Sequence, residues 1–383
     1  MKANKIRRVL LIILVPFISF SQDKFKIRLQ AKSFINDSLI IGVPDGVPMG
    51  FEELYHFKIE PDDKVNDLKV KMGFTNSYYS IKIETENILT GNTNYPKPVN
   101  FIYSKPQNDE MPVISGIFFI ENGTFQIDLP SFENNYEVFL NSPSNIDFKK
   151  LKKSLSSIYV KSKNSLKPDS LISFDKKQQI LKKHILRNPT SYAALWQIIF
   201  DYSEYHQEQN YQEILQHFSV EMKNSKLFKD FTFKLDQEKA TAIGKTMPTI
   251  SLDNYTQITL DSYSNYELTL VDYWSTTCGP CIKVLPEIVD THQKFKNIGL
   301  NIISISDDIG AERIKMANQI LIRNKASWSN YFDLKNDFKN KVNATAYPFY
   351  MLIDKKGQIL LRSIGDFNLI KDSIITKLNN TNK

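Results

Sequence analysis

The two cysteines of this 383-residue chain, Cys278 and Cys281, are spaced for thiol chemistry. They form a C-x-x-C motif shortly after the apolar, strand-like run 268–271, which predicts that the first cysteine begins a helix. The unpaired N–H groups and the dipole of a helix N-terminus stabilise a thiolate. The motif therefore predicts that Cys278 is an exposed, attacking thiol. Cys281, one turn further in, is then expected to resolve the mixed disulfide and close a Cys278–Cys281 bridge.

Two other uses of a cysteine pair fit this sequence less well. A structural disulfide that closes a loop of about four residues contributes only on the order of 2 kcal/mol, which is little in a chain of this length. A closed zinc site needs four Cys or His ligands, and the histidines show no paired metal spacing. The histidines are His56, His184, His206, His217 and His292. The sequence thus predicts a redox-active disulfide, with no bound metal and no organic cofactor.

The segments around the motif resemble the active-site segments of thioredoxins. Residues 270–274 (LVDYW), followed by 278–281 (CGPC) and Pro286, are similar to the segment that carries the thioredoxin dithiol. Residues 346–354 (AYPFYMLID) resemble the segment that places a cis-proline, here Pro348, beside the dithiol and then continues as a central strand. The resemblance implies a thioredoxin-like α/β fold and thiol-disulfide exchange.

The spacing between these two segments is longer than in minimal thioredoxins. It contains an extra helical pattern over 311–326 and a short strand-like piece over 328–332. This arrangement is similar to the TlpA/ResA-like branch of secreted thiol-disulfide oxidoreductases. The resemblance places the thioredoxin-like domain at 244–383.

Site residues follow from the resemblance one position at a time. Asp272 corresponds to the buried acid that takes and returns the proton of Cys281, and a carboxylate with little water around it has a raised pKa that suits this exchange. A cis Pro348 turns the neighbouring backbone toward the sulfurs, so that Tyr347 hydrogen-bonds an incoming substrate segment. The remaining site residues are Trp274 and Thr277 at the substrate side, and Gly279, Pro280 and Pro286 as structural residues of the motif.

Two positions depart from the family pattern and leave partner choice open. Thr277 stands where these families usually have tryptophan, and Tyr347 precedes the proline where a smaller residue is usual. Two further groups are not assigned to the chemistry. His292 lies too far along the predicted helix for a catalytic role, and the acidic pair 307–308 after the predicted strand 300–305 is expected to cap a helix rather than bind metal.

The N-terminus predicts export. Residues 1–21 combine four basic residues, an apolar run too short to span a bilayer and small residues before a cleavage point after about Ser21, which together indicate a signal peptide. No cysteine follows the run to carry a lipid anchor, and no later stretch is long and apolar enough for a transmembrane span. We expect the mature chain in the periplasm or cell envelope.

The small net charge limits the classes of partner that the chain is expected to bind. The formal net charge of +7 includes the four basic residues of 1–21, which holds no acidic residue, so the mature chain carries +3. Such a small excess with interspersed charges indicates a solvated surface and no nucleic-acid binding. The expected partners are exported proteins with thiols or disulfides, together with a membrane redox partner that recharges the dithiol.

The part before the dithiol domain predicts two further units. Residues 22–155 alternate apolar and polar residues in short runs, which predicts an all-β domain, an antiparallel sandwich or open barrel. Its predicted strands include 69–72 and 114–120, with an Asn-Gly hairpin at 121–124. The motif over 116–123 weakly resembles the β-rich domain of Bacteroidetes envelope proteins.

Residues 165–240 show helical periodicity and predict a helical connector, with a break at Pro189. Its aromatic residues are more often core than a docking surface. They are Trp196, Phe200, Tyr202 and Tyr205.

Together these patterns predict a multi-domain chain that reduces disulfides of exported proteins. An alternative from another class is a non-catalytic envelope module that binds a peptide, glycan or assembly partner on a thioredoxin-like scaffold, which Thr277 and Tyr347 slightly favour. A peroxidase is disfavoured, because the motif lacks peroxide-activating polar groups around one cysteine. The direction of electron flow is not encoded in C-x-x-C, since reductants and oxidants share the motif.

Overall fold

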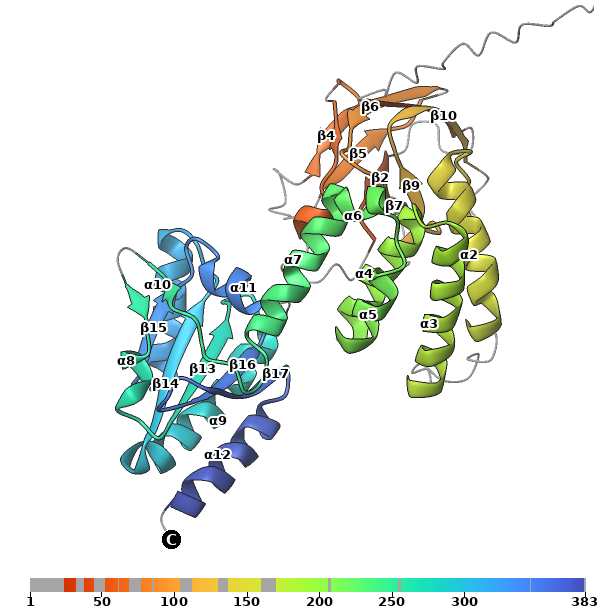
Figure 1. The fold of residues 1–383 in the computed structure, drawn as a ribbon. Coiled ribbons are helices and arrows are strands. Elements are labelled where there is room, and N and C mark those ends of the chain that lie inside the picture. Colours follow the sequence, from red (N-terminus) through yellow and green to blue (C-terminus); the bar gives the residue numbers. More distant parts are fainter. Residues whose placement is uncertain are drawn as a thin grey trace, which may run out of the picture.

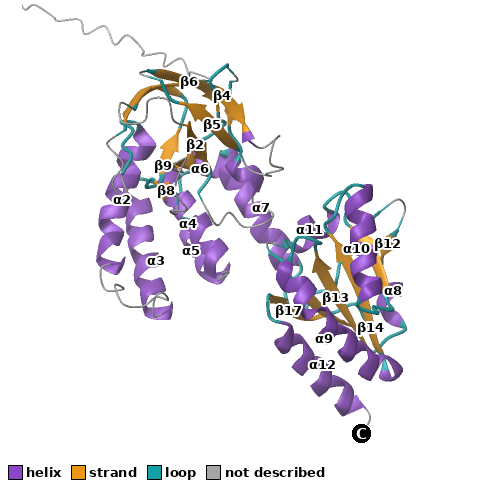
Figure 2. Cartoon of the chain, turned by 180° about the vertical axis from the view of Figure 1, so that it is seen from behind, coloured by secondary structure: helices purple, strands orange, loops and turns teal. Residues whose placement is uncertain are grey.

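The structure of the chain is a computed structural model. It describes residues 24–31, 38–44, 52–60, 62–68, 77–84, 86–103, 112–129, 137–159, 170–205, 208–253, 256–344 and 346–381. The predicted signal peptide over 1–21 and the predicted strand over 69–72 lie outside these residues. The described chain forms an N-terminal body of strands and helices and a C-terminal α/β domain, which a long helix joins (Figure 1, Figure 2).

The N-terminal body contains two sheets, and several of their strands, such as β1 (Phe25–Gln30), follow the alternation of apolar and polar residues. In β1, Phe25, Ile27 and Leu29 are buried, while Lys26 and Arg28 are exposed. One sheet has the order β10-β1-β6-β3; the other has the order β4-β5-β2-β7-β8, with β9 paired to β7. The further strands are β2 (Ser38–Gly42), β3 (Lys58–Ile59), β4 (Val65–Asp67), β5 (Tyr78–Lys82), β6 (Asn87–Asn92), β7 (Lys97–Tyr103), β8 (Val113–Ile114), β9 (Phe118–Ile120) and β10 (Gly123–Asp128).

The strand pairing differs from the sequence prediction in two places. The strand predicted over 114–120 is divided into β8 and β9. The hairpin predicted at 121–124 is wrong, because β9 pairs with β7 whereas β10 pairs in parallel with β1 in the other sheet. The Asn-Gly turn thus carries the chain from one sheet to the other. The N-terminal sheets are therefore not purely antiparallel.

Helices cover the strands of the N-terminal body. They are the 3-10 helix η2 (Glu52–Tyr55), α2 (Pro143–Tyr159), α3 (Ser170–Arg187), α4 (Tyr192–Tyr205), α5 (Glu208–Leu215), α6 (Val220–Asn224) and α7 (Lys226–Ala240). Because α2 begins at Pro143, the helical part starts inside the range 22–155 predicted as β-rich. The predicted break at Pro189 is confirmed, since it lies between the end of α3 and the start of α4.

The strands and helices of this body share one core. Trp196 and Tyr202 of α4 are fully buried, which confirms that these two aromatic side chains are core. The indole Nε1 of Trp196 donates to the Pro96 carbonyl oxygen at 2.7 Å, and its ring centroid lies 4.6 Å from that of Tyr55. The predicted β-rich and helical parts therefore pack as a single body.

The C-terminal domain is a five-stranded sheet with the order β15-β14-β13-β16-β17. Strand β13 (Leu268–Trp274) is parallel to β14 (Leu300–Ser306) and antiparallel to β16 (Phe349–Asp354). The other elements are β11 (Ile250–Ser251), β12 (Gln257–Ile258), α8 (Asp261–Ser264), α9 (Gly279–Phe295), η4 (Lys296–Ile298), α10 (Ala311–Arg323), β15 (Ser329–Phe332), α11 (Asp337–Val342), β17 (Ile359–Ile364) and α12 (Phe367–Thr381). The predicted helix over 311–326 and strand over 328–332 are present as α10 and β15.

The sheet is buried on both faces, and the alternation along β13 decides what each face meets. Leu268 and Leu270 pack with α9 and α12, whereas Val271 and Tyr273 point to the opposite core around α11. Asp272 has the parity of Leu268 and Leu270. The fold therefore places this carboxyl on the face that α9 covers.

Helix α7 joins the two bodies. Its buried Phe231 and Leu235 belong to the N-terminal core. Its other end contacts the C-terminal domain, where Arg362 Nη1 donates to the carbonyl oxygens of Glu238 at 3.2 Å and Thr241 at 3.0 Å. Asn343 Nδ2 also donates to the Tyr202 hydroxyl at 2.9 Å. The two bodies are thus connected by side-chain contacts as well as by the chain.

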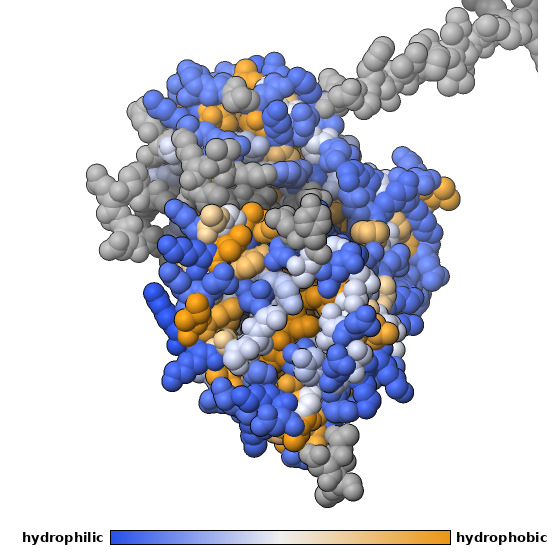
Figure 3. All heavy atoms as spheres, turned by 90° about the vertical axis from the view of Figure 1, so that its left-hand side faces the viewer, coloured by the Kyte–Doolittle hydropathy of each residue, from blue (hydrophilic) through white to orange (hydrophobic). Residues whose placement is uncertain are grey.

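Within the described ranges, we find no helix with the length and apolar character that a bilayer span requires. Figure 3 shows one face of the molecule, on which hydrophilic side chains predominate and apolar ones gather in separate groups. Exposed apolar residues on and beside α10 include Ile309, Met316 and Ile322.

Candidate active site

The two cysteines form a disulfide at the junction of β13 and α9. Their Cα atoms lie 5.3 Å apart. Cys278 is the N-cap residue of α9, and its Sγ accepts a hydrogen bond from the Cys281 N–H at 3.1 Å. The strand-to-helix junction predicted from the C-x-x-C motif is confirmed. A reduced Cys278 sulfur at this position has an N–H donor and the positive end of the helix dipole to stabilise negative charge.

The prediction that Cys278 is exposed is wrong. Cys278 retains 8% of its accessible surface and Cys281 retains 5%, so the first cysteine is only slightly the more accessible. The reason is tertiary packing, which the motif does not contain. Trp274 from β13 and residues of α10 such as Ala317 and Leu321 form one apolar cluster with both cysteines. The surface that the dithiol offers to a partner is therefore small, and slightly more of it belongs to Cys278 than to Cys281.

An exposed rim surrounds this accessible part. Thr277, Gly279 and Pro280 are exposed on either side of Cys278, and Tyr347 is half-buried against the same apolar cluster. Pro286 lies further along α9 and is also exposed. The structure thus gathers Trp274, Thr277 and Tyr347 around the dithiol, whereas Pro286 lies farther along α9, in the interior of the helix sequence.

Asp272 is a buried carboxyl in the middle of the sheet. It retains 4% of its accessible surface, and its register partners are Ser304 on β14 and Tyr350 on β16. Burial raises the pKa of Asp272 to about 7, although a hydrogen bond from Ser304 Oγ to Oδ2 at 3.2 Å acts to lower it. A carboxyl with a pKa near neutrality can both accept and return a proton under ordinary conditions.

Ser304 connects Asp272 to a partly buried tryptophan, Trp328, that sequence reasoning missed. Trp328 Nε1 donates to Ser304 Oγ at 2.7 Å, which leaves the serine hydroxyl hydrogen for Asp272. The Trp328 ring meets His292 edge-on, with centroids 5.3 Å apart. Burial lowers the pKa of His292, and Lys296 adds to this effect. The available sequence signal was the position of Ser304 between the apolar residues Ile303 and Ile305 of the predicted strand.

Replacing Ser304 with alanine is expected to raise the pKa of Asp272 further. The variant removes a hydrogen bond that favours the charged carboxylate, so the pKa should rise by about one unit. A carboxyl ¹³C NMR titration of the oxidised protein measures this value directly. Ser329→Ala, at an exposed serine of the neighbouring strand β15, is the matched control and should leave the titration unchanged. An unaltered Asp272 titration in Ser304→Ala would contradict the assignment.

The second wall of the site is formed by the segment before β16. The Tyr347-Pro348 peptide bond is cis, in agreement with the expectation from the resemblance. The Tyr347 hydroxyl donates to the Asp307 carboxylate, and its ring centroid lies 5.3 Å from that of Tyr273. The tyrosine side chain is therefore held by two contacts beside the dithiol.

The acidic pair 307–308 does not cap α10 as predicted. The N-cap of α10 is Gly310, which makes no side-chain capping bond. Asp307 instead binds Tyr347, and Asp308 is buried beneath the loop 275–277 that leads to Cys278. The capping prediction failed because Thr276, which binds both carboxylate oxygens of Asp308, lies 32 residues away in sequence.

Other parts of the described structure offer fewer reactive or ligand-binding groups than the dithiol. Among the described residues, no group of three or more His, Cys, Asp or Glu side chains is placed to hold a metal ion. A hollow of about 510 Å³ lies within the N-terminal body, away from the dithiol. Its polar side chains already bind one another, for example Ser144 with Glu121 and Ser191 with Asp147. The dithiol therefore remains the candidate active site.

The C-terminal domain is similar to known proteins. A family model described as thioredoxin-like matches residues 265–359. A thiol:disulfide interchange protein from Bacteroides sp. is 23% identical over 37% of this chain and 92% of that chain, with a TM-score of 0.32. The thioredoxin domain of a thiol-disulfide oxidoreductase from Bacteroides vulgatus is 23% identical over 35% of this chain and 98% of that chain, with a TM-score of 0.29. No curated protein matches the chain. The predicted architecture, a thioredoxin-like domain preceded by β-rich and helical parts, is confirmed.

Proposed function

We propose that the chain is an exported thiol-disulfide oxidoreductase that reduces disulfides of protein substrates through Cys278 and Cys281. The position of Cys278 carries the proposal. Its Sγ lies at the start of α9 and accepts the N–H of Cys281 at 3.1 Å. In the reduced protein the same N–H and the helix dipole favour the thiolate, which is the attacking form in disulfide exchange.

The exchange proceeds in two steps that move two electrons to the substrate. The Cys278 thiolate attacks one sulfur of the substrate disulfide, so that a mixed disulfide forms and the other substrate sulfur leaves as a thiolate. The Cys281 thiolate then attacks Cys278 Sγ, closes the Cys278–Cys281 bridge and releases the second substrate thiolate. The dithiol is oxidised and the substrate is reduced. No metal or organic cofactor takes part.

Asp272 is the proposed proton acceptor for Cys281. It lies on the sheet face that α9 covers, and burial brings its pKa to about 7. The charged carboxylate takes the Cys281 proton before the second attack, and the neutral acid returns a proton to a leaving thiolate. Ser304 holds the carboxyl through its hydrogen bond to Oδ2.

The compartment and partners of the proposed enzyme follow from its N-terminus. The signal-peptide pattern of residues 1–21 supports export to the periplasm or cell envelope. The substrates are then exported proteins with disulfides, and a membrane redox partner returns two electrons to the Cys278–Cys281 bridge after each cycle. Thr277 and Tyr347 border the dithiol and are the proposed substrate contacts.

One observation favours a second function, a non-catalytic module that binds a partner on the thioredoxin-like scaffold. Cys278 retains only 8% of its accessible surface, which restricts the approach of a substrate disulfide. Such a module would keep the Cys278–Cys281 bridge as a local crosslink. The two functions differ in whether a reduced Cys278 forms covalent adducts with a disulfide protein.

A trapping experiment tests the proposal. Reduced Cys281→Ser keeps the attacking thiol but lacks the resolving thiol, so it is expected to accumulate a mixed disulfide with insulin. Non-reducing electrophoresis detects the adduct, and dithiothreitol should release it. The reduced wild type should pass through this adduct and liberate the insulin chains. A lack of adduct from Cys281→Ser would favour the binding module instead.

A further inference from the structure

Asp308 is a fully occupied hydrogen-bond acceptor beside the active-site loop. It retains 1% of its accessible surface. Its Oδ2 accepts from the Thr276 N–H at 2.8 Å and from Ser306 Oγ at 2.7 Å. Its Oδ1 accepts from Thr276 Oγ1 at 2.7 Å and from Arg313 Nε at 2.8 Å. Burial acts to raise the pKa of Asp308, but the bonds from Ser306, Thr276 and Arg313 outweigh it and keep the pKa below its usual value.

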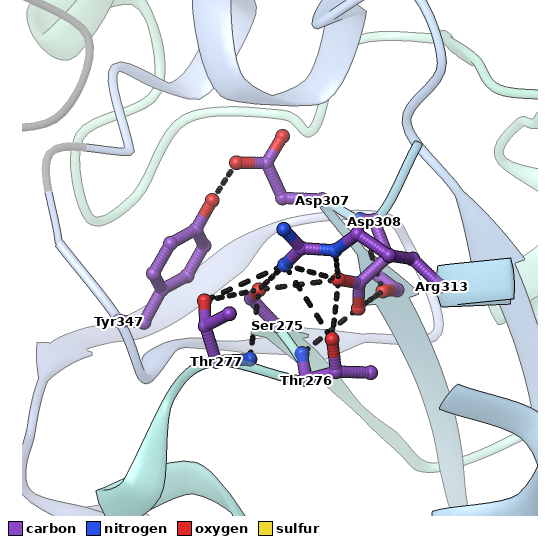
Figure 4. A network of polar contacts seen from close by, with 8 residues as sticks. Ser275, Thr276, Thr277, Asp307, Asp308, Arg313 and Tyr347 are labelled. Atoms are coloured by element: carbon purple, nitrogen blue, oxygen red, sulfur yellow. Dashed lines mark hydrogen bonds and ion pairs between the residues drawn. The ribbon is translucent and has the colours of Figure 1, made fainter. Parts of the chain in front are cut away.

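Arg313, in the first turn of α10, covers the same loop from the solvent side. Its side chain is 45% exposed, and Nη2 lies 2.7 Å from Asp308 Oδ1. The same nitrogen also lies 3.3 Å from Ser275 Oγ and 3.5 Å from Thr277 Oγ1. Figure 4 shows the guanidinium beside the hydroxyl groups of Ser275, Thr276 and Thr277. One ion pair thus contacts all three residues that precede Cys278.

The loop in turn sets the place of Cys278. The Cys278 N–H donates to the Ser275 carbonyl oxygen at 3.0 Å, so a movement of Ser275 moves the residue that caps α9. Hydrogen bonds to a charged carboxylate are about twice as strong as neutral ones. A loop fixed by several such bonds has little freedom to carry the sulfur away from the helix N-terminus.

We propose that Asp308 and Arg313 are positioning residues, which hold the loop 275–277 so that Cys278 Sγ stays aligned with the start of α9. The inference rests on the proposed function, since it assigns these residues to the nucleophile of that reaction. Neither residue touches the substrate in this role. The neighbouring Asp307 holds Tyr347 on the opposite wall, so a single turn after β14 supports both sides of the site.

The test uses Arg313→Gln, because a half-exposed arginine can be replaced with little risk to folding. In a Cys281→Ser background, the alkylation of Cys278 by iodoacetamide at pH 7 should slow by about tenfold, since a displaced sulfur loses its stabilisation as thiolate. With both cysteines present, the reduction potential against glutathione should become more negative by about 30 mV, which is a tenfold change for this two-electron couple. Arg313→Lys keeps the charge and should restore part of the alkylation rate and part of the reduction potential.

Controls separate this role from general support of the fold. Arg323→Gln changes an exposed arginine at the other end of the same helix and should leave alkylation and potential unchanged. Asp308→Asn should act in the same direction as Arg313→Gln. A lower melting temperature of Arg313→Gln with unchanged alkylation and potential would overturn the inference. Failure of the wild type to reduce insulin would refute the enzyme function alone, because alkylation is measured without any substrate.

Discussion

Replacing Cys278 with serine is expected to abolish the reduction of insulin disulfides and leave only the uncatalysed rate. The serine hydroxyl stays protonated at neutral pH and cannot form a mixed disulfide, whereas the Cys278 thiolate is formed beside the N–H of Cys281. Turbidity from precipitating insulin chains, in the presence of dithiothreitol, measures the loss. The variant should also form no adduct with insulin on non-reducing gels.

Cys281→Ser is the matched control for this loss. Both single variants lack the same bridge, so both lose its stabilisation, on the order of 2 kcal/mol for so short a loop. A difference between them in adduct formation therefore reports the chemistry of each sulfur and not the stability of the fold. Appreciable insulin reduction by Cys278→Ser would remove Cys278 from the role of nucleophile.

Replacing Asp272 with asparagine is expected to stabilise the oxidised protein above neutral pH. The pKa of this buried carboxyl is about 7 in the folded protein, against 3.8 for an aspartate that the fold does not perturb, as in the unfolded chain. Between these values the unfolded chain is ionised while the folded protein holds the proton, so the free energy of unfolding falls as pH rises from about 4 to 7. The total loss is roughly 4 kcal/mol. Asparagine does not ionise, so the Asp272→Asn variant should not show this pH-dependent loss of stability.

Urea unfolding at pH 5 and pH 8 measures the effect. The stability advantage of Asp272→Asn over the wild type should be larger at pH 8, and Asp290→Asn, at an exposed position on α9, should show no such pH-dependent gain. The same Asp272→Asn variant should resolve the mixed disulfide slowly, because Cys281 has lost its proton acceptor. Equal stability gains at both pH values would show that Asp272 ionises normally in the folded protein.

The dithiol, its strand and its helix were predictable because their signals are local. The apolar run of β13 and the motif of α9 are adjacent in the sequence, and the helix N-cap follows from that order. The cis bond before Pro348 was also expected, although from a family resemblance and not from the dipeptide, since cis X-Pro bonds are uncommon.

The features that the sequence did not reveal depend on contacts between distant segments. Asp308 resembles a helix cap locally, but its main partner Thr276 lies 32 residues away. The low exposure of Cys278 arises from α10 and β15, which pack around it only in the folded domain. The turn at 121–124 carries a hairpin signal, yet β10 finds its partner in β1 at the other end of the N-terminal body's sequence. The sequence therefore predicted the local motifs, but it did not predict which distant elements pair or pack together.

The contacts of α7 with both bodies affect how a protein substrate can approach the dithiol. Arg362, which receives the end of α7, lies on β17, and β17 pairs with the strand that directly follows Pro348. Side-chain contacts at the end of α7, and not the chain connection alone, therefore hold the sulfurs in one orientation relative to the N-terminal body. Under the proposed function, we expect a substrate that docks on the N-terminal body to present its disulfide to Cys278 in one orientation.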